Sequence, residues 1–291
     1  MRYGIPYVGS KNKIAEKIID KLPPAKHFYD LFGGGGAMTH CALLSGKYEF
    51  VHYNELNPLV FKCFKMALNG EFKNENRWIS REDFNRLKDS DPYVACCFSF
   101  GNDFKTYAYG KNCELFKKAV HYSIVFDDNS LLNNYIDLSN FKYNSENIKE
   151  RRSELHSLLK KSKLNIEYGK PNQPVSQHQI WLERLQELNI RGVLLSNLSY
   201  EQVPIESDSV IYCDPPYKET DSYLDDFDHE KFYSWLRTLK QQVFISEYQM
   251  PSDFYEVFSI KKRVLINDKL NTQKLEKLFS NIPYVNDPLS W

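Results

Sequence analysis

Long apolar runs are missing from this sequence of 291 residues, although 42% of its residues are hydrophobic. No run approaches the ~20 consecutive apolar residues that a membrane-spanning helix needs. The first residues, MRYGIPYVGSKNK, lack the apolar core of a secretory signal peptide. An excess of either charge is missing too, because Lys plus Arg and Asp plus Glu both number 38. We therefore expect a soluble globular chain with one large domain, or one domain plus an insert.

Cysteine pairs of the C-x-x-C type are also absent. Neither a disulfide framework nor a metal site is therefore expected, and a reducing cytoplasm fits best. A P-loop Gly-Lys-Ser/Thr is absent, which disfavours ATP hydrolysis, and no helix-turn-helix or zinc-finger spacing occurs. Aromatic residues are abundant by contrast, with 20 Tyr and 19 Phe. They serve either as core and surface residues or as a stacking surface for nucleobases.

An alternation of strands and helices occupies both ends of the chain. The first end is predicted to contain an amphipathic helix at 11–21, strands at 27–32 and from 50, and helices from 37 and at 57–70. The second end is predicted to contain strands at 191–200, 209–213 and 242–248, a helix at 232–239, and a strand pair within 255–266. We therefore expect one α/β domain formed by residues 1–70 and 191–291.

The middle of the chain, residues 71–190, has a different character. It is rich in Asn, Lys, Ser and Tyr, and its apolar periodicity is weak. Helical segments are predicted near 112–124, 145–162 and 176–189. We interpret residues 71–190 as a mostly helical region inserted into the α/β domain.

A glycine run follows the first predicted strand. In DLFGGGG, Asp30 ends the strand and Gly33–Gly36 form the turn before a helix. Glycine allows a ligand to lie against the main chain, and cofactors bind at strand ends of open α/β sheets. Glu55 follows the next strand, where an acid can bind ribose hydroxyls. The sequence thus favours a nucleotide-type cofactor site, although flexible loops also use glycine runs.

A second motif, CDPPY, ends the strand at 209–213. The exocyclic amine of a nucleobase is a poor nucleophile, because its lone pair is delocalised into the ring. Asp214 and the carbonyl of Pro215 can each accept one amine hydrogen, and the prolines hold that backbone rigidly. Tyr217 can stack on the base, which contributes ~1–3 kcal/mol. The alternative is a plain strand end followed by a polar turn.

These motifs, in this order, resemble the DNA adenine N6-methyltransferases, namely the Dam-like enzymes of the D12 class, particularly the short phage and prophage forms. The resemblance covers residues 3–70 and 191–280. RYGIPYVGSKNK resembles the family's N-terminal segment, FYDLFGGGGAMTH its glycine motif, VHYNELNP the acidic motif, CDPPY the catalytic tetrad and FISEYQMP the next strand. It implies a Rossmann-like AdoMet-dependent methyltransferase sheet with an inserted, mostly helical DNA-recognition region.

The resemblance also implies site residues. The catalytic tetrad would be Asp214, Pro215, Pro216 and Tyr217. S-adenosyl-L-methionine would be bound by Tyr7, Lys11, Asp30, Phe32, Gly33, Gly35, Glu55, Ser199 and Asp214. Two positions depart from the family pattern: Glu55 stands where Asp is usual, and Ser199 stands where many members have an acid.

Two stretches of the middle region are candidates for DNA contact. Residues 98–110 (FSFGNDFKTYAYG) combine Lys with aromatic residues, and residues 149–163 carry six basic against two acidic side chains. Basic side chains bind phosphates, whereas a charge run is more often a solvated helix face and an aromatic segment is often core. The predicted DNA-binding residues are Lys105, Tyr107, Arg151, Arg152, Lys160 and Lys161.

The resulting hypothesis is an enzyme that transfers a methyl group from S-adenosyl-L-methionine to adenine N6 in a specific duplex DNA sequence, with base flipping. Asp at the first tetrad position favours adenine. The alternatives are N4-cytosine methylation, RNA adenine or protein glutamine methylation, and an inactive DNA-binding protein that retains the fold. Double-stranded DNA is the expected partner of a monomer in the cytoplasm of a bacterium or phage-infected cell, and a cognate restriction endonuclease stays open.

Overall fold

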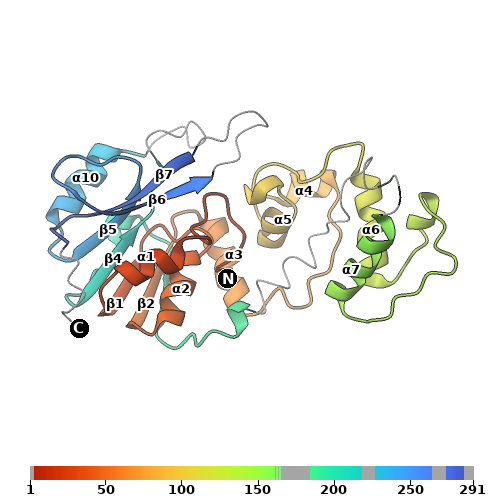
Figure 1. The fold of residues 1–291 in the computed structure, drawn as a ribbon, viewed down its shortest axis with the longest axis horizontal. Helices are drawn as coiled ribbons and strands as arrows, with labels where there is room; N and C mark the ends of the chain where they lie inside the picture. The colour runs from red at the N-terminus through yellow and green to blue at the C-terminus, as the bar shows by residue number, and fades with distance from the viewer. Residues whose placement is uncertain are drawn as a thin grey trace. The chain divides into compact units, whose positions relative to one another are not determined.

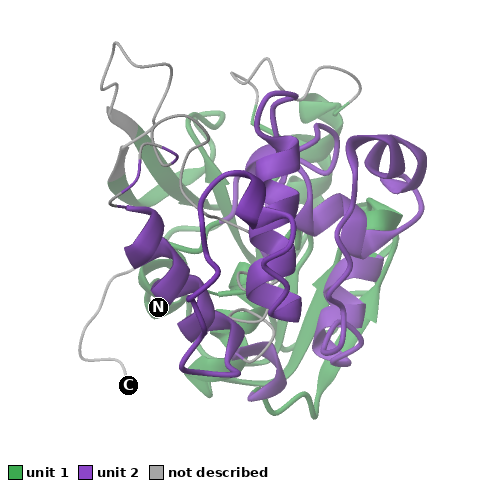
Figure 2. Ribbon diagram, turned by 90° about the vertical axis from the view of Figure 1, so that its right-hand side faces the viewer, with its two compact units in different colours: residues 1–4, 11–61, 188–291 green, residues 5–10, 62–187 purple. Residues whose placement is uncertain are grey.

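The computed structural model describes residues 3–160, 162, 164, 184–217, 227–263 and 273–284. The chain forms two compact units, shown in Figure 2. The sheet unit comprises residues 1–4, 11–61 and 188–291, and the helical unit comprises residues 5–10 and 62–187. Within the described residues, no helix has the length and apolar character needed to cross a membrane.

The sheet unit is built on seven strands in the part of the chain that the structure describes (Figure 1). Their spatial order is β3-β2-β1-β4-β5-β7-β6. The strands from β3 to β5 are mutually parallel, and β7 is antiparallel to both of its neighbours. The bounds are β1 Ala25–Asp30, β2 Tyr48–Asn54, β3 Val193–Ser196, β4 Ser209–Cys213, β5 Gln242–Glu247, β6 Tyr255–Arg263 and β7 Gln273–Ser280. The predicted Rossmann-like α/β class is confirmed.

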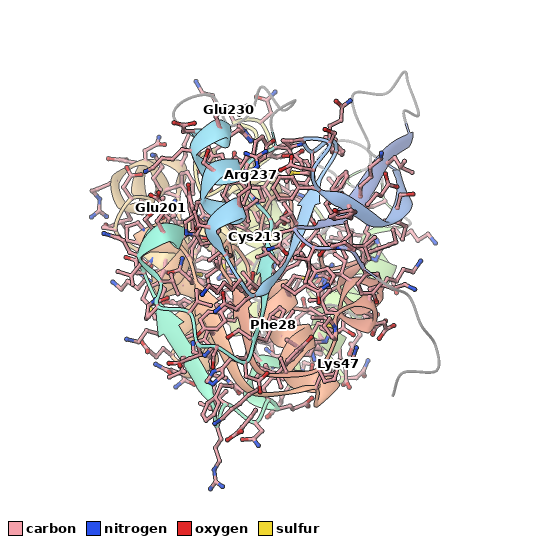
Figure 3. The ribbon with its side chains drawn as sticks, turned by 90° about the vertical axis from the view of Figure 1, so that its left-hand side faces the viewer. Phe28, Lys47, Glu201, Cys213, Glu230 and Arg237 are labelled. Atoms are coloured by element: carbon pink, nitrogen blue, oxygen red, sulfur yellow. The ribbon has the colours of Figure 1, made fainter. Side chains whose placement is uncertain are left out.

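Helices cover both faces of this sheet because side chains alternate along each strand. Phe28 of β1 points to one face, where α1 (Ala15–Lys21) and α2 (Ala37–Ser45) pack. Tyr29 belongs to the other face, whose core includes residues of α10 (His229–Thr238). Figure 3 views the molecule from the α10 side and labels Arg237 on that helix and Cys213 on β4. The central strands β1 and β4 are adjacent, so their carboxyl ends lie side by side.

The helical unit contains short helices with polar N-caps. Ser80, Asp91 and Asn147 each accept backbone N–H groups at the start of α4, α5 and α7, as expected for helix N-termini. Apolar side chains of α6 and α7 form its separate core. The bounds are α3 Pro58–Leu68, which begins in the sheet unit, α4 Arg81–Leu87, α5 Pro92–Cys97, η1 Phe100–Asn102, α6 Glu114–Phe126, η2 Leu132–Asn134 and α7 Ile148–Leu159. Thus α6 and α7 confirm the helices predicted near 112–124 and 145–162.

Two of the predicted strand regions differ from the structure, and one predicted helix is only partly described. The strand predicted at 191–200 is the shorter β3, Val193–Ser196, whose Leu194 is 47% exposed because in the described residues β3 pairs with β2 alone. The strand pair predicted within 255–266 is wrong, because β6 continues to Arg263 and its partner is β7. Most of the helix predicted at 176–189 lies outside the described residues.

Candidate active site

The glycine loop between β1 and α2 is packed too closely for side chains. A Cβ atom on Gly33 would lie 2.2 Å from the ring of Tyr53. Gly4, from the N-terminal segment, has φ +65°, and its Cβ would lie 2.2 Å from the carbonyl oxygen of Gly35. The Tyr53 hydroxyl also donates to the carbonyl of Gly34 at 2.7 Å. The loop backbone is therefore fixed by its neighbours, which suits a surface that a ligand approaches closely.

Two predicted cofactor-binding acids hold this loop and the helix after it. Asp30 is buried, and its Oδ2 accepts the backbone N–H and the hydroxyl of Thr39, at 3.1 and 2.7 Å, in the first turn of α2. Burial raises the pKa of Asp30 to about 7. Glu55 accepts the N–H of Gly34 with Oε2 and that of Asn57 with Oε1, both at 2.8 Å. Burial also raises the pKa of Glu55. The ribose contact of Glu55 and the cofactor contact of Asp30 stay predictions.

Asn54 joins three strand ends, a role that the sequence analysis missed. Its Nδ2 donates to the carbonyls of Leu31 and Leu198, both at 3.0 Å. Its Oδ1 accepts from the Ser196 hydroxyl at 2.8 Å and from the backbone N–H of Leu198 at 3.1 Å. Leu31 follows β1, and Leu198 follows β3. One buried amide thus fixes the carboxyl ends of β1, β2 and β3, and the only sequence signal was its place beside Glu55.

Asp214, the first residue of the tetrad, lies in a buried ionic cluster at the carboxyl end of β4. The ammonium of Lys11 is 2.7 Å from Asp214 Oδ1 and 3.1 Å from Glu276 Oε1. Lys11 and Glu276 are 5% and 3% exposed, so solvent screens these contacts little. Although burial opposes its charge, the two carboxylates raise the pKa of Lys11, which stays protonated. Lys11 was predicted to touch the cofactor, and the structure brings it to the tetrad.

Tyr217 is held from three directions. Its hydroxyl donates to Glu276 Oε1. The ammonium of Lys11 lies 4.9 Å from its ring centroid, over one face. The ring of Tyr248 meets it edge-on, with 4.7 Å between centroids. No sequence motif indicated Glu276, which lies in a run of alternating charges, or Tyr248, which directly follows β5. We call the side chains of Lys11, Asp214, Tyr217 and Glu276 the tetrad cluster. This cluster is distinct from the catalytic tetrad, which is the run of four consecutive residues from Asp214 to Tyr217.

Three other predicted cofactor residues have contacts with other parts of the chain. Tyr7 belongs to the helical unit, where its ring contacts Phe104 edge-on at 5.6 Å. Phe32 stacks on Tyr200 at 5.5 Å, on the α10 face of the sheet. Ser199 precedes η3 (Tyr200–Gln202), and its backbone N–H donates to the Gln202 side chain at 3.4 Å. Their contacts with a cofactor stay predictions.

The aromatic segment at 98–110 folds back on itself. The N–H of Phe100 donates to the carbonyl of Thr106 at 2.6 Å. Tyr107 is buried, and its hydroxyl donates to the carbonyl of Ile79 at 2.9 Å, so this predicted DNA-binding ring serves the core of the helical unit. Lys105 is exposed, and so is Phe100, at 67%, which the sequence analysis did not single out.

The six basic residues of the stretch at 149–163 differ in exposure, and half of them lie on α7. Arg151 is mostly buried and donates to the carbonyl of Ser145 at 2.8 Å, with Asp127 3.7 Å away. Burial lowers the pKa of Arg152, which is half-buried. Lys160 is exposed at the end of the helix, and Lys161 lies outside the described residues. Lys160 is therefore the most accessible of the predicted phosphate contacts that the structure describes on this helix.

Comparisons with known proteins agree with the motifs. The family model of the D12 class N6 adenine-specific DNA methyltransferases matches residues 7–281. The chain is also similar to the Type II methyltransferase M.MjaIII of Methanocaldococcus jannaschii, with 24% identity over 298 residues, which covers 93% of this chain and 94% of that protein. The match spans both the glycine loop and the tetrad.

Proposed function

This chain belongs to the D12 class of N6 adenine-specific DNA methyltransferases, and from that premise we propose that it methylates adenine N6 in one duplex DNA sequence, using S-adenosyl-L-methionine and flipping the target base. The resemblance in its motifs is thereby confirmed, and with it the adenine-specific enzyme class. The observation that carries the finer proposal is the tetrad cluster at the carboxyl end of β4, beside the glycine loop that follows β1.

The methyl donor fits the strand ends on structural grounds. The close packing at Gly33 and Gly4 requires glycine there and fixes the loop backbone after β1, at the carboxyl end of the sheet, where cofactors bind in open α/β sheets. Asp30 ends β1, and Glu55 and Asp214 directly follow the neighbouring strands β2 and β4. We propose that Glu55 and Asp214 contact the donor. The bound donor supplies a methyl group on a positively charged sulfur. The protein contributes binding, orientation and the exclusion of water.

We propose that the target amine is oriented by the tetrad. Asp214 and the Pro215 carbonyl accept the two N6 hydrogens, which directs the nitrogen lone pair out of the base plane. Because Lys11 covers one face of the Tyr217 ring, a stacked adenine takes the opposite face. Transfer would be direct, without a covalent enzyme intermediate: the sulfur–methyl bond of the donor would break as the nitrogen–methyl bond forms, leaving a neutral thioether, and one N6 proton would then be lost. N4-cytosine methylation is disfavoured by the family and by Asp at the first tetrad position.

We further propose that residues 71–190 are the target-recognition region inserted between residues 1–70 and 191–291 of the catalytic domain. The exposed side chains of Phe100, Lys105 and Lys160 are its candidate DNA contacts. We propose a monomer that acts in the cytoplasm. The relative's name, a type II methyltransferase, is compatible with a cognate restriction endonuclease as a further partner.

The direct test is methyl transfer from tritiated S-adenosyl-L-methionine to duplex DNA, followed by nucleoside analysis. We expect label in N6-methyl-2′-deoxyadenosine, at one short DNA sequence. Label in N4-methylcytosine, or transfer to RNA or protein in preference to DNA, would replace the proposal by one of its alternatives. No transfer with intact donor and DNA binding would indicate an inactive member of the family.

Base flipping predicts a fluorescence change. A base must leave the stack for its amine to reach an enclosed pocket, at a cost of a few kcal/mol that is smallest at a mismatch. A duplex with 2-aminopurine at the target position should brighten on binding, and a mispaired target should bind at least as tightly as the matched one. Tyr217→Ala should brighten it further, because a restacked ring quenches. Constant fluorescence in both proteins, with weaker binding to the mismatch, would contradict flipping.

Cys213→Ala should retain most of the methyl transfer activity. Cys213 is fully buried among apolar residues of the α10 face, including Phe232 and Leu236, and burial raises its thiol pKa well above the usual range. The thiol is therefore neutral and directed away from Asp214, as strand alternation predicts. Single-turnover rates, normalised to correctly folded protein, would check this. Loss of transfer with unchanged donor and DNA binding would point to a cysteine nucleophile instead.

A further inference from the structure

Glu276 is a buried carboxylate in the tetrad cluster for which neither the sequence motifs nor the family description gives a role. It lies on β7, is 3% exposed, and contacts the ammonium of Lys11 and the hydroxyl of Tyr217 with the same oxygen, Oε1. Desolvating a carboxylate is costly unless its partners offset the cost. Its two identified partners are both residues to which the sequence analysis assigned functions.

We propose that Glu276 is a positioning residue for methyl transfer, holding the Tyr217 ring at the angle at which the base stacks and holding Lys11 against Asp214. This inference rests on the proposed function. Glu276 touches neither donor nor base in it, and acts through its two neighbours.

The geometry around Tyr217 supports this role. A tyrosine ring on a loop after two prolines can still rotate about its side-chain bonds. The hydroxyl bond to Glu276 fixes the far end of the ring, and the edge contact with Tyr248 fixes its side. With Lys11 over one face, one orientation and one stacking face are selected before DNA arrives. Pre-organisation of this kind raises the rate of the chemical step, because less ordering is left for the transition state.

The geometry around Lys11 adds a second effect. A lysine side chain is long and flexible, and a single carboxylate would leave its ammonium several positions. Lying 2.7 Å from Asp214 and 3.1 Å from Glu276, it is held between two acids. Asp214 Oδ1 is thereby occupied by a fixed donor, which orients the carboxylate plane. In this arrangement, Glu276 sets the direction of the acceptor that the target amine meets.

Glu276→Gln and Tyr217→Phe, alone and combined, test the inference. Glutamine keeps the shape but loses the charge, so it weakens both the hydrogen bond from the Tyr217 hydroxyl and the ion pair with Lys11. Phenylalanine keeps the stacking ring and loses the hydroxyl. A ring that only stacks would tolerate Tyr217→Phe. Glu256→Gln is the matched control, because Glu256 lies on neighbouring β6 and forms a surface ion pair with Lys277 at 2.8 Å.

We expect Glu276→Gln to lower the single-turnover rate at saturating S-adenosyl-L-methionine and DNA by on the order of 10- to 100-fold. We expect Tyr217→Phe to lower the single-turnover rate by about 10-fold. The double variant should be slower than the slower single variant by less than about 3-fold, because both changes weaken the same hydrogen bond between Tyr217 and Glu276. Calorimetric affinity for the donor should stay within about 3-fold of wild type. Glu256→Gln should match wild type throughout.

Three results would overturn the inference while leaving the proposed function intact. The first is a wild-type rate in Glu276→Gln. The second is multiplication of the two effects in the double variant, which would mean that they act independently. The third is loss of thermal stability and donor binding with an unchanged rate for the bound complex, which would mean a purely structural role. A wild-type enzyme that methylates no adenine would overturn the proposed function, and this inference with it.

Discussion

Asp214→Ala should abolish methyl transfer, with a loss on the order of 10³-fold or more in the single-turnover rate. The variant removes the acceptor assigned to the target amine. It also leaves Lys11 buried with Glu276 as its remaining acid partner in the tetrad cluster, which disturbs the cluster's charge balance. Affinity for S-adenosyl-L-methionine should fall as well, because Asp214 is assigned a place between donor and base. Tritium transfer and calorimetry measure the two effects separately.

The matched comparison for this variant is Tyr217→Ala. It removes the stacking ring and should impair catalysis while leaving donor affinity nearly unchanged. The two variants therefore separate a residue that serves both ligands from one that serves the base. Equal losses of donor affinity in both variants would show that these roles are wrongly assigned.

Asp30→Asn should stabilise the folded protein at neutral and alkaline pH. Burial raises the pKa of Asp30 from its ordinary value of 3.8 to about 7. A raised carboxyl pKa means that the folded state resists ionisation, so wild-type stability falls as the pH rises from about 4 to about 7. Asparagine keeps an oxygen for Thr39 and has no charge to bury. The gain in the free energy of unfolding of Asp30→Asn over wild type should approach ~4 kcal/mol at pH 8 and shrink towards zero near pH 4.

Urea denaturation of both proteins at pH 5, 6.5 and 8 measures this difference. Asp83→Asn is a control of opposite sign, because hydrogen bonds from Arg86 and Ser80 lower the pKa of this exposed acid. That variant should be slightly less stable than wild type at pH 8. A constant difference between Asp30→Asn and wild type across the pH range would mean that Asp30 does not titrate as burial requires.

Local patterns predicted the parts of the site that depend on local geometry. The strand, glycine loop and helix around Asp30 were predicted from the apolar pattern and the glycine run, and the contact at Gly33 shows why glycine is needed there. The place of the tetrad was predicted from a strand that ends at two prolines. The Lys11 and Glu276 contacts could not be predicted in this way. The contact between Lys11 and Glu276 requires β7 to lie antiparallel beside β5, and nothing in the sequence near either residue indicates that strand pairing.

The aromatic segment shows a second limit. Period-two or helical spacing cannot tell which of its rings is buried, because the backbone has positive φ at Asn102 and Phe104, at +59° and +62°. Left-handed residues turn the chain and change which side chains share a face. The result is a buried Tyr107 and an exposed Phe100, where the sequence analysis had favoured Tyr107 for DNA contact.

The hydrogen bonds of Asn54 have a consequence for the order of folding. Its partners Ser196 and Leu198 lie 142 and 144 residues further along the chain, and β1 lies between β2 and β4 in the sheet. A chain emerging from the ribosome therefore completes the helical unit's sequence before β3 and β4 exist. Contacts of such separation slow folding and leave early strand edges exposed. The carboxyl end of the sheet is thus among the last parts of the molecule that synthesis allows to form.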